Sequence, residues 1–195
     1  MKMRIRRWLI MGLAMGSAVT LSQDAFAYDF KLIIVIYDHA NVSTETLSGA
    51  EDTASTVFGN AGVQLVWREG FAYAAERRSL LNPAPEDPVT LVVKLQPESE
   101  APHYGVRSVC GGIALGPNAI IFVRFFDATW IGYVVAHELG HILLGPHAHS
   151  IVGIMRRTLL PEEWTKAAQR TLGFTSSQNQ QIRTWIAEKK PSLTI

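Results

Sequence analysis

The chain of 195 residues contains one cysteine, Cys110. A single cysteine excludes an internal disulfide, so no covalent cross-link of that kind holds the fold together. Cys110 can be a free thiol, the partner in a disulfide between two chains, or a metal ligand. We expect a small buried or loop thiol, because a free cysteine behaves in most proteins as a small apolar side chain.

The chain also lacks an excess of charge of either sign. It has 18 Lys and Arg residues against 17 Asp and Glu residues, a formal net charge of +1 at neutral pH. No basic patch suggests a surface for the phosphates of DNA or RNA. The composition therefore excludes nucleic acid as an expected partner.

After the N-terminal segment, no hydrophobic run is long enough to span a membrane. The run within that segment, Trp8–Leu21, is also short. It follows four basic residues and precedes the small-x-small sequence Ala25-Phe26-Ala27. This pattern predicts a secretory signal peptide over residues 1–27 and an exported protein, periplasmic or secreted, that does not associate with a membrane after cleavage. The alternative is an uncleaved N-terminal anchor. Cleavage would leave 14 basic and 16 acidic residues, a net charge of about −2.

The pattern of apolar residues predicts one α+β domain over residues 28–195, with a twisted mixed sheet of about four or five strands. Runs rich in β-branched residues indicate strands, and a period near 3.6 residues indicates helices. We expect strands at 30–37, 63–67, 89–95 and 120–123, a short strand around 112–115, and helices at 44–60, from about 127 to 144, and at 176–189. Residues 96–119 are otherwise expected to form a long loop and one wall of a cleft.

Four of the six histidines lie within residues 137–149. The first two belong to the sequence His137-Glu138-Leu139-Gly140-His141, in the middle of an expected helix. Residues four apart lie on one face of a helix, so His137 and His141 can bind the same metal ion. Glu138 follows the first histidine directly and can take a proton from a metal-bound water. The flanking residues are strongly apolar, and metal binding would satisfy the polar groups of a buried helix. We therefore predict a single catalytic Zn²⁺.

A catalytic zinc site needs a third protein ligand and keeps a fourth position open. Two histidines after the helix, His147 and His149, are candidates for the third ligand. Pro146 stiffens the chain directly before His147 and makes an immediate return to the helix harder. We favour His149, with His147 as the alternative.

Residues 137–155, HELGHILLGPHAHSIVGIM, resemble the metzincin metallopeptidases, as does the expected order of strands and helices. The metzincin motif is HExxHxxGxxH, followed by a turn that contains a methionine. By this resemblance, Met155 lies in the methionine turn beneath the metal and does not bind it. The chain departs from the motif at one position, because Leu144 stands where the motif has glycine and Gly145 follows one residue later.

The motif and the resemblance together predict an exported zinc metallopeptidase, a monomer that acts on peptides or proteins. In this hypothesis Glu138 accepts the proton of the zinc-activated water and passes it to the leaving amine. The strand at 120–123 would be the edge strand along which an extended peptide aligns. One alternative is a catalytically weak, metal-stabilised peptide-binding module. Another is a zinc hydrolase of a non-peptide amide, because the motif specifies activation of water and not the acyl group that is attacked.

Overall fold

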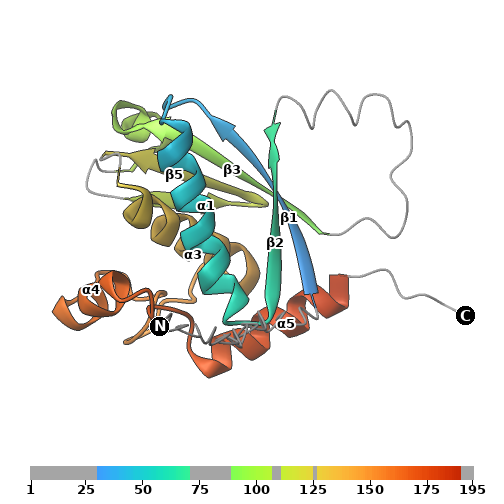
Figure 1. The fold of residues 1–195 in the computed structure, drawn as a ribbon. Coiled ribbons are helices and arrows are strands. Elements are labelled where there is room, and N and C mark those ends of the chain that lie inside the picture. Colours follow the sequence, from blue (N-terminus) through green and yellow to red (C-terminus); the bar gives the residue numbers. More distant parts are fainter. Residues whose placement is uncertain (1–29, 71–88, 107–110, 125–126, 190–195) are drawn as a thin grey trace, which may run out of the picture.

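A mixed five-stranded sheet forms the centre of the protein in the computed structural model, which describes residues 30–70, 89–106, 111–124 and 127–189 (Figure 1). The strands are β1 (Phe30–Asp38), β2 (Val63–Glu69), β3 (Thr90–Pro97), β4 (Gly112–Leu115) and β5 (Asn118–Val123). Their order across the sheet is β2-β1-β3-β5-β4. Neighbouring strands are parallel except for β4, which pairs antiparallel with β5. The antiparallel strand therefore lies at one edge of the sheet.

Helices cover the sheet on both faces. The described helices are α1 (Thr44–Gly59), the 3₁₀ helix η1 (Glu98–Tyr104), α3 (Ala128–Leu144), α4 (Pro161–Ala168) and α5 (Ser176–Lys189), of which α4 lies away from the sheet. Figure 1 shows α1 and α3 beside each other against one face, while α5 passes beneath β1 and β2. The short helix η1 packs against β5 and β3. The expected α+β fold with a mixed sheet is thus confirmed.

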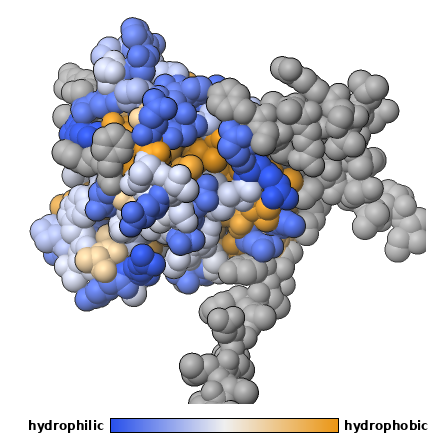
Figure 2. All heavy atoms as spheres, turned by 45° about the horizontal axis from the view of Figure 1, so that its top comes forward, coloured by the Kyte–Doolittle hydropathy of each residue, from blue (hydrophilic) through white to orange (hydrophobic). Residues whose placement is uncertain are grey.

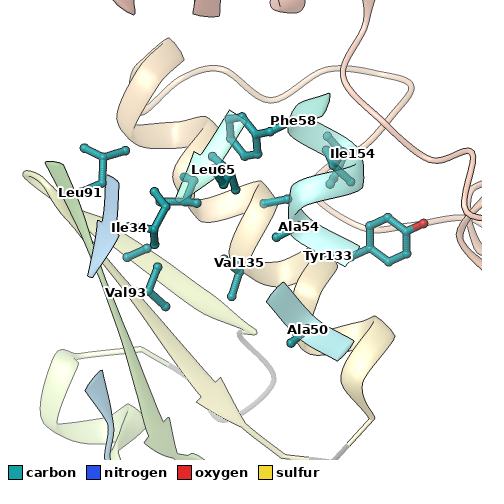
Figure 3. Packing of buried hydrophobic residues seen from close by; sticks show 14 of the residues in the cluster. Ile34, Ala50, Ala54, Phe58, Leu65, Leu91, Val93, Tyr133, Val135 and Ile154 are labelled. Carbon is teal, nitrogen blue, oxygen red and sulfur yellow. The ribbon is translucent and has the colours of Figure 1, made fainter. Parts of the chain in front are cut away.

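The core lies between the sheet and the helix pair α1 and α3. Figure 3 shows Ile34 and Val93 from the sheet facing Ala54 from α1 and Val135 from α3. β5 is buried on both faces, because Ile121 belongs to this core while its neighbours in the sequence, Ile120 and Phe122, pack against residues of η1. Burial on both faces explains why β5 is a continuous apolar run without alternation.

Side-chain caps set the beginnings of the two helices against the sheet. Ser43 accepts a hydrogen bond from the amide of Thr46 at the start of α1, and Asp127 accepts one from the amide of Trp130 at the start of α3. These bonds satisfy amides that have no partner within the helix. The cap at Asp127 matters most for function, because α3 carries the HExxH sequence.

The structure corrects one assignment and adds two elements. The strand at 120–123, expected at the edge, is β5, and it pairs with β3 on one side and β4 on the other. β4 is the edge strand instead. The long loop expected at 96–119 contains η1, and α4 was not expected at all. The expected signal peptide and Cys110 lie outside the described residues.

The described surface has hydrophobic regions but no membrane span. No helix within the described ranges combines the length and apolar character needed to cross a membrane. Figure 2 shows one face of the molecule, on which hydrophobic residues gather in the middle, between hydrophilic ones. The hydrophobic interior therefore reaches the surface on this face.

Candidate metal centre

Three histidine rings converge at the C-terminal half of α3. The Nε2 atom of His141 lies 3.1 Å from Nε2 of His137 and 3.1 Å from Nε2 of His149. Their ligand atoms all lie within 4.8 Å of one another, and within the described residues no other group of His, Cys, Asp or Glu is arranged in this way. The helical spacing of four residues accounts for the first pair, and the chain after α3 supplies the third ring.

A tight turn after α3 returns the chain toward the helix. Gly145 adopts a φ of 96°, which is unfavourable for residues with a side chain, and its amide donates to the carbonyl of His141. The amide of Ala148 then donates to the carbonyl of Gly145. This reversal brings His149 to the helical pair. The alternative, His147, is exposed within the turn and lines a separate hollow beside α5.

Backbone carbonyls hold two of the rings in one orientation. Nδ1 of His137 lies 2.7 Å from the carbonyl oxygen of Ile154, and Nδ1 of His141 lies 3.3 Å from that of Gly145. A carbonyl only accepts hydrogen bonds, so each Nδ1 carries the proton. In the neutral rings of His137 and His141, Nε2 is then unprotonated, and the two Nε2 atoms face each other. Second-shell hydrogen bonds of this kind are usual for histidines that bind metals.

The three nitrogens fit a bound metal ion. The unprotonated Nε2 atoms of His137 and His141, 3.1 Å apart, repel each other unless a cation lies between them. Protonation does not resolve this, because burial lowers the pKa of His137 to about 4 and also lowers those of His141 and His149. Ligands at about 2.05 Å from a tetrahedral ion lie about 3.3 Å apart, within a few tenths of an ångström of the observed separation. The three histidines can therefore hold a metal ion.

Glu138 lies beneath the edge strand and faces the same cleft. Its side chain is buried, and this burial raises its pKa to about 7. The strand β4 approaches it so closely that a Cβ atom on Gly112 would lie 2.7 Å from Cγ of Glu138. Glycine at this position therefore lets the edge strand and the carboxyl group meet at the cleft.

Met155 packs against α3 at Gly140, which lies between His137 and His141 in the sequence. It is fully buried, and a Cβ atom on Gly140 would lie 2.5 Å from its sulfur. The amide of Ser150 donates to the carbonyl of Met155, which closes the segment that carries Ile154 and its bond to His137. Met155 thus packs against α3 at Gly140, in the turn of the helix that carries His137 and His141.

The histidines line an open cleft of about 950 Å³. The edge strand β4 forms part of its wall, and the segment 156–159 with Trp164 of α4 forms another part. We did not predict this second wall. Its signals were Pro161 at the first position of a helix and Glu163 two residues later, whose side chain accepts a hydrogen bond from the amide of Leu160. Arg156 and Arg157 in this wall were also missed.

Comparisons with known proteins give this site no name. No family model matches the chain, and the comparison with curated proteins found no match. The resemblance to metzincins therefore depends on residues 137–155 and on the order of the elements.

Proposed function

We propose that the protein is an exported zinc-dependent metallopeptidase, with His137, His141 and His149 as the metal ligands. The observation that carries the proposal is the convergence of three Nε2 atoms beside a buried carboxyl group, at the floor of an open cleft. A site that served only to stabilise the fold would be expected to have four protein ligands and to be closed. Here three ligands face open space.

Three imidazole ligands favour zinc over magnesium or calcium, which prefer oxygen ligands. A zinc ion bound there would lower the pKa of a water ligand to about 7 and polarise a carbonyl group. The chain's own part is to keep the Nε2 atoms unprotonated, through the bonds from Nδ1 of His137 and His141 to backbone carbonyls. The burial of His137 and His141 acts in the same direction, since it disfavours their protonated forms.

Glu138 is the proposed general base. Its carboxyl group lies next to His137 in the sequence and lines the same cleft, so it is placed to accept a proton from water at the metal and to pass it to the leaving amine. No other acidic side chain of the described residues lines the cleft. This assignment makes Glu138 necessary for turnover but not for binding the metal.

The edge strand β4 is the proposed guide for the substrate. It pairs with β5 on one side, and its other side is the edge of the sheet at the cleft. An extended peptide can add to such an edge by main-chain hydrogen bonds. A polypeptide substrate fits this arrangement better than a small amide, which has no backbone to align.

The test compares the purified, zinc-loaded wild-type protein with the variant Glu138→Gln on a diverse mixture of synthetic peptides, with products read by mass spectrometry. We expect wild type to cut and the variant to lose at least about 100-fold in rate while it keeps stoichiometric zinc. Glu162→Gln, an exposed carboxyl on α4, is the matched control and should cut like wild type.

Each other outcome points to a different function. Equal cleavage by Glu138→Gln would refute the general-base role. A folded, zinc-loaded wild type that cuts no peptide would refute the peptidase proposal. It would favour the metal-stabilised binding module, or a hydrolase of non-peptide amides if such compounds are turned over.

A further inference from the structure

The part of the cleft wall formed by residues 156–159 and Trp164 carries two adjacent positive charges. Arg156 and Arg157 both line the cleft, just after the segment that supports the histidines. The only acidic residue among the described residues that line it is Glu138. The chain as a whole has a formal net charge of only +1, so this excess of positive charge is local to the cleft.

Arg156 is already engaged within the fold. Its Nη1 donates to the carbonyl of Ile151 and lies 3.8 Å from Oε1 of Glu163. The side chain of Glu163 is only 4% exposed, and its other oxygen accepts a hydrogen bond from the amide of Leu160. The charge of Arg156 is therefore balanced by a buried carboxylate, and its role is to fix α4 to the segment beneath the site.

Arg157 differs from its neighbour because it is exposed and makes no hydrogen bond or ion pair to another described residue. It lines the same cleft as His149. Beside it, Leu159 and the half-exposed ring of Trp164 give the wall an apolar surface. The wall thus combines an apolar surface with one cation that lacks a partner in the described structure.

We propose that Arg157 selects substrates with a carboxylate, so that the cleft prefers peptides with Asp or Glu close to the bond at the metal. This inference rests on the proposed function, because it concerns the substrate of the same site. An incoming carboxylate would form a charge-assisted hydrogen bond with the guanidinium, and the positive cleft would attract acidic peptides from solution. A basic side chain at the same place would be repelled.

The experiment measures binding, so that it does not depend on turnover. Two matched pools of synthetic peptides are applied to immobilised, zinc-loaded Glu138→Gln protein, and in the second pool Asn and Gln replace every Asp and Glu. We expect the acidic pool to be retained about fivefold more strongly, the ratio typical of one partly exposed ion pair. Adding Arg157→Gln should bring the ratio close to one, and Arg157→Glu should reverse it. Arg157→Lys should keep a preference for the acidic pool.

Lys166→Gln is the matched control, because Lys166 is an exposed cation on α4 that does not line the cleft. It should leave the ratio unchanged. An equal ratio with and without Arg157, no preference for the acidic pool, or no retention of any peptide would each overturn the inference. Cleavage by wild type is measured in parallel. Its absence would refute the peptidase proposal, whereas the binding ratio would still decide the role of Arg157.

Discussion

The ring of His137 interacts through both of its nitrogens. Nδ1 bonds to the carbonyl of Ile154, and Nε2 faces the other two histidines. The segment 150–155, which contains Ile154, therefore leaves Nε2 of His137 as the nitrogen available for a metal. His149 has no such bond among the described residues and reaches the site from an exposed loop. Among the three candidate ligands, His149 is thus the least constrained.

The two candidates for the third ligand can be separated by measuring zinc affinity. His149→Gln should weaken zinc binding at least about 100-fold, because loss of a ligand costs more than the 10- to 100-fold typical of its supporting partners. His147→Gln should bind zinc like wild type, since His147 lies exposed outside the cluster. Competition with a chromogenic chelator gives both constants. The reverse order of the two variants would show that His147 is the ligand.

Glu138 makes the stability of the metal-free protein depend on pH. Burial raises its pKa to about 7, against 4.5 in an unfolded chain. Between these values the folded protein binds the extra proton, so Glu138 adds stability as the pH falls from about 7 to 4.5. Burial of His137, whose pKa is lowered to about 4, acts in the opposite sense between about 6.5 and 4 and offsets it.

Glu138→Gln removes one side of this balance. Without metal, its free energy of unfolding should fall relative to wild type by about 3 kcal/mol between pH 7 and 4.5, since each pKa unit corresponds to about 1.4 kcal/mol. Urea unfolding in the presence of a chelator, over a pH series, measures the difference. Glu162→Gln should follow wild type, because this carboxyl is exposed. Parallel curves for Glu138→Gln and wild type would contradict a raised pKa.

At the scale of elements, α3 connects the core to the metal site. Its N-terminal part packs against α1 so closely that a Cβ atom on Gly132 would lie 2.6 Å from the carbonyl oxygen of Ala50. Its C-terminal part contacts Met155 at Gly140. Gly132 and Gly140 therefore allow both close contacts of α3.

Gly140→Ala tests the contact under the metal site. The added methyl group would meet the sulfur of Met155 and, at 2.9 Å, Cε1 of Phe174, so we expect a loss of about 1–3 kcal/mol in stability and weaker zinc binding. Gly173→Ala is the matched control, because its Cβ atom would have nothing within 4 Å. In the double variant with Met155→Ala, part of the cost of Gly140→Ala should disappear. Thermal unfolding and zinc titration measure both effects, and strictly additive costs would rule out this contact.

At the scale of the whole molecule, a bound metal would link α3 to the chain that follows it. His137 and His141 belong to the helix, whereas His149 belongs to the return loop. The turn at Gly145 and the support of Met155 complete this connection. A metal ion would therefore stabilise the folded chain and not only the site.

Removing zinc should lower the thermal stability of the protein. At a free zinc concentration of 100 times the dissociation constant, binding contributes about 2.7 kcal/mol, which corresponds to a shift in Tm of roughly 5–10 °C for a domain of this size. Differential scanning calorimetry with and without a chelator measures the shift. Magnesium should not restore it, because the ligands are nitrogens. His149→Gln should show a much smaller shift, and an equal shift in that variant would argue against its role as a ligand.

Local periodicity was sufficient to predict much of this protein. The spacing of four residues places His137 and His141 on one face of any helix, and β-branched runs located the strands. The caps Ser43 and Asp127 are local features too, because a cap acts on amides two or three residues away. These features depend on neighbours in the sequence, so the sequence by itself determined them.

Only the tertiary structure decided how distant segments meet. The apolar run of β5 suits an edge strand or an inner strand equally well, and pairing with β3 and β4 makes it an inner strand. The approach of His149 depends on the turn at Gly145, and the position of Arg156 and Arg157 in the cleft wall depends on the packing of α4. Sequence periodicity encodes neither of these. Helical and strand patterns act over a few residues, whereas strand order, the return of a loop and the walls of a cleft depend on contacts between residues far apart in the chain.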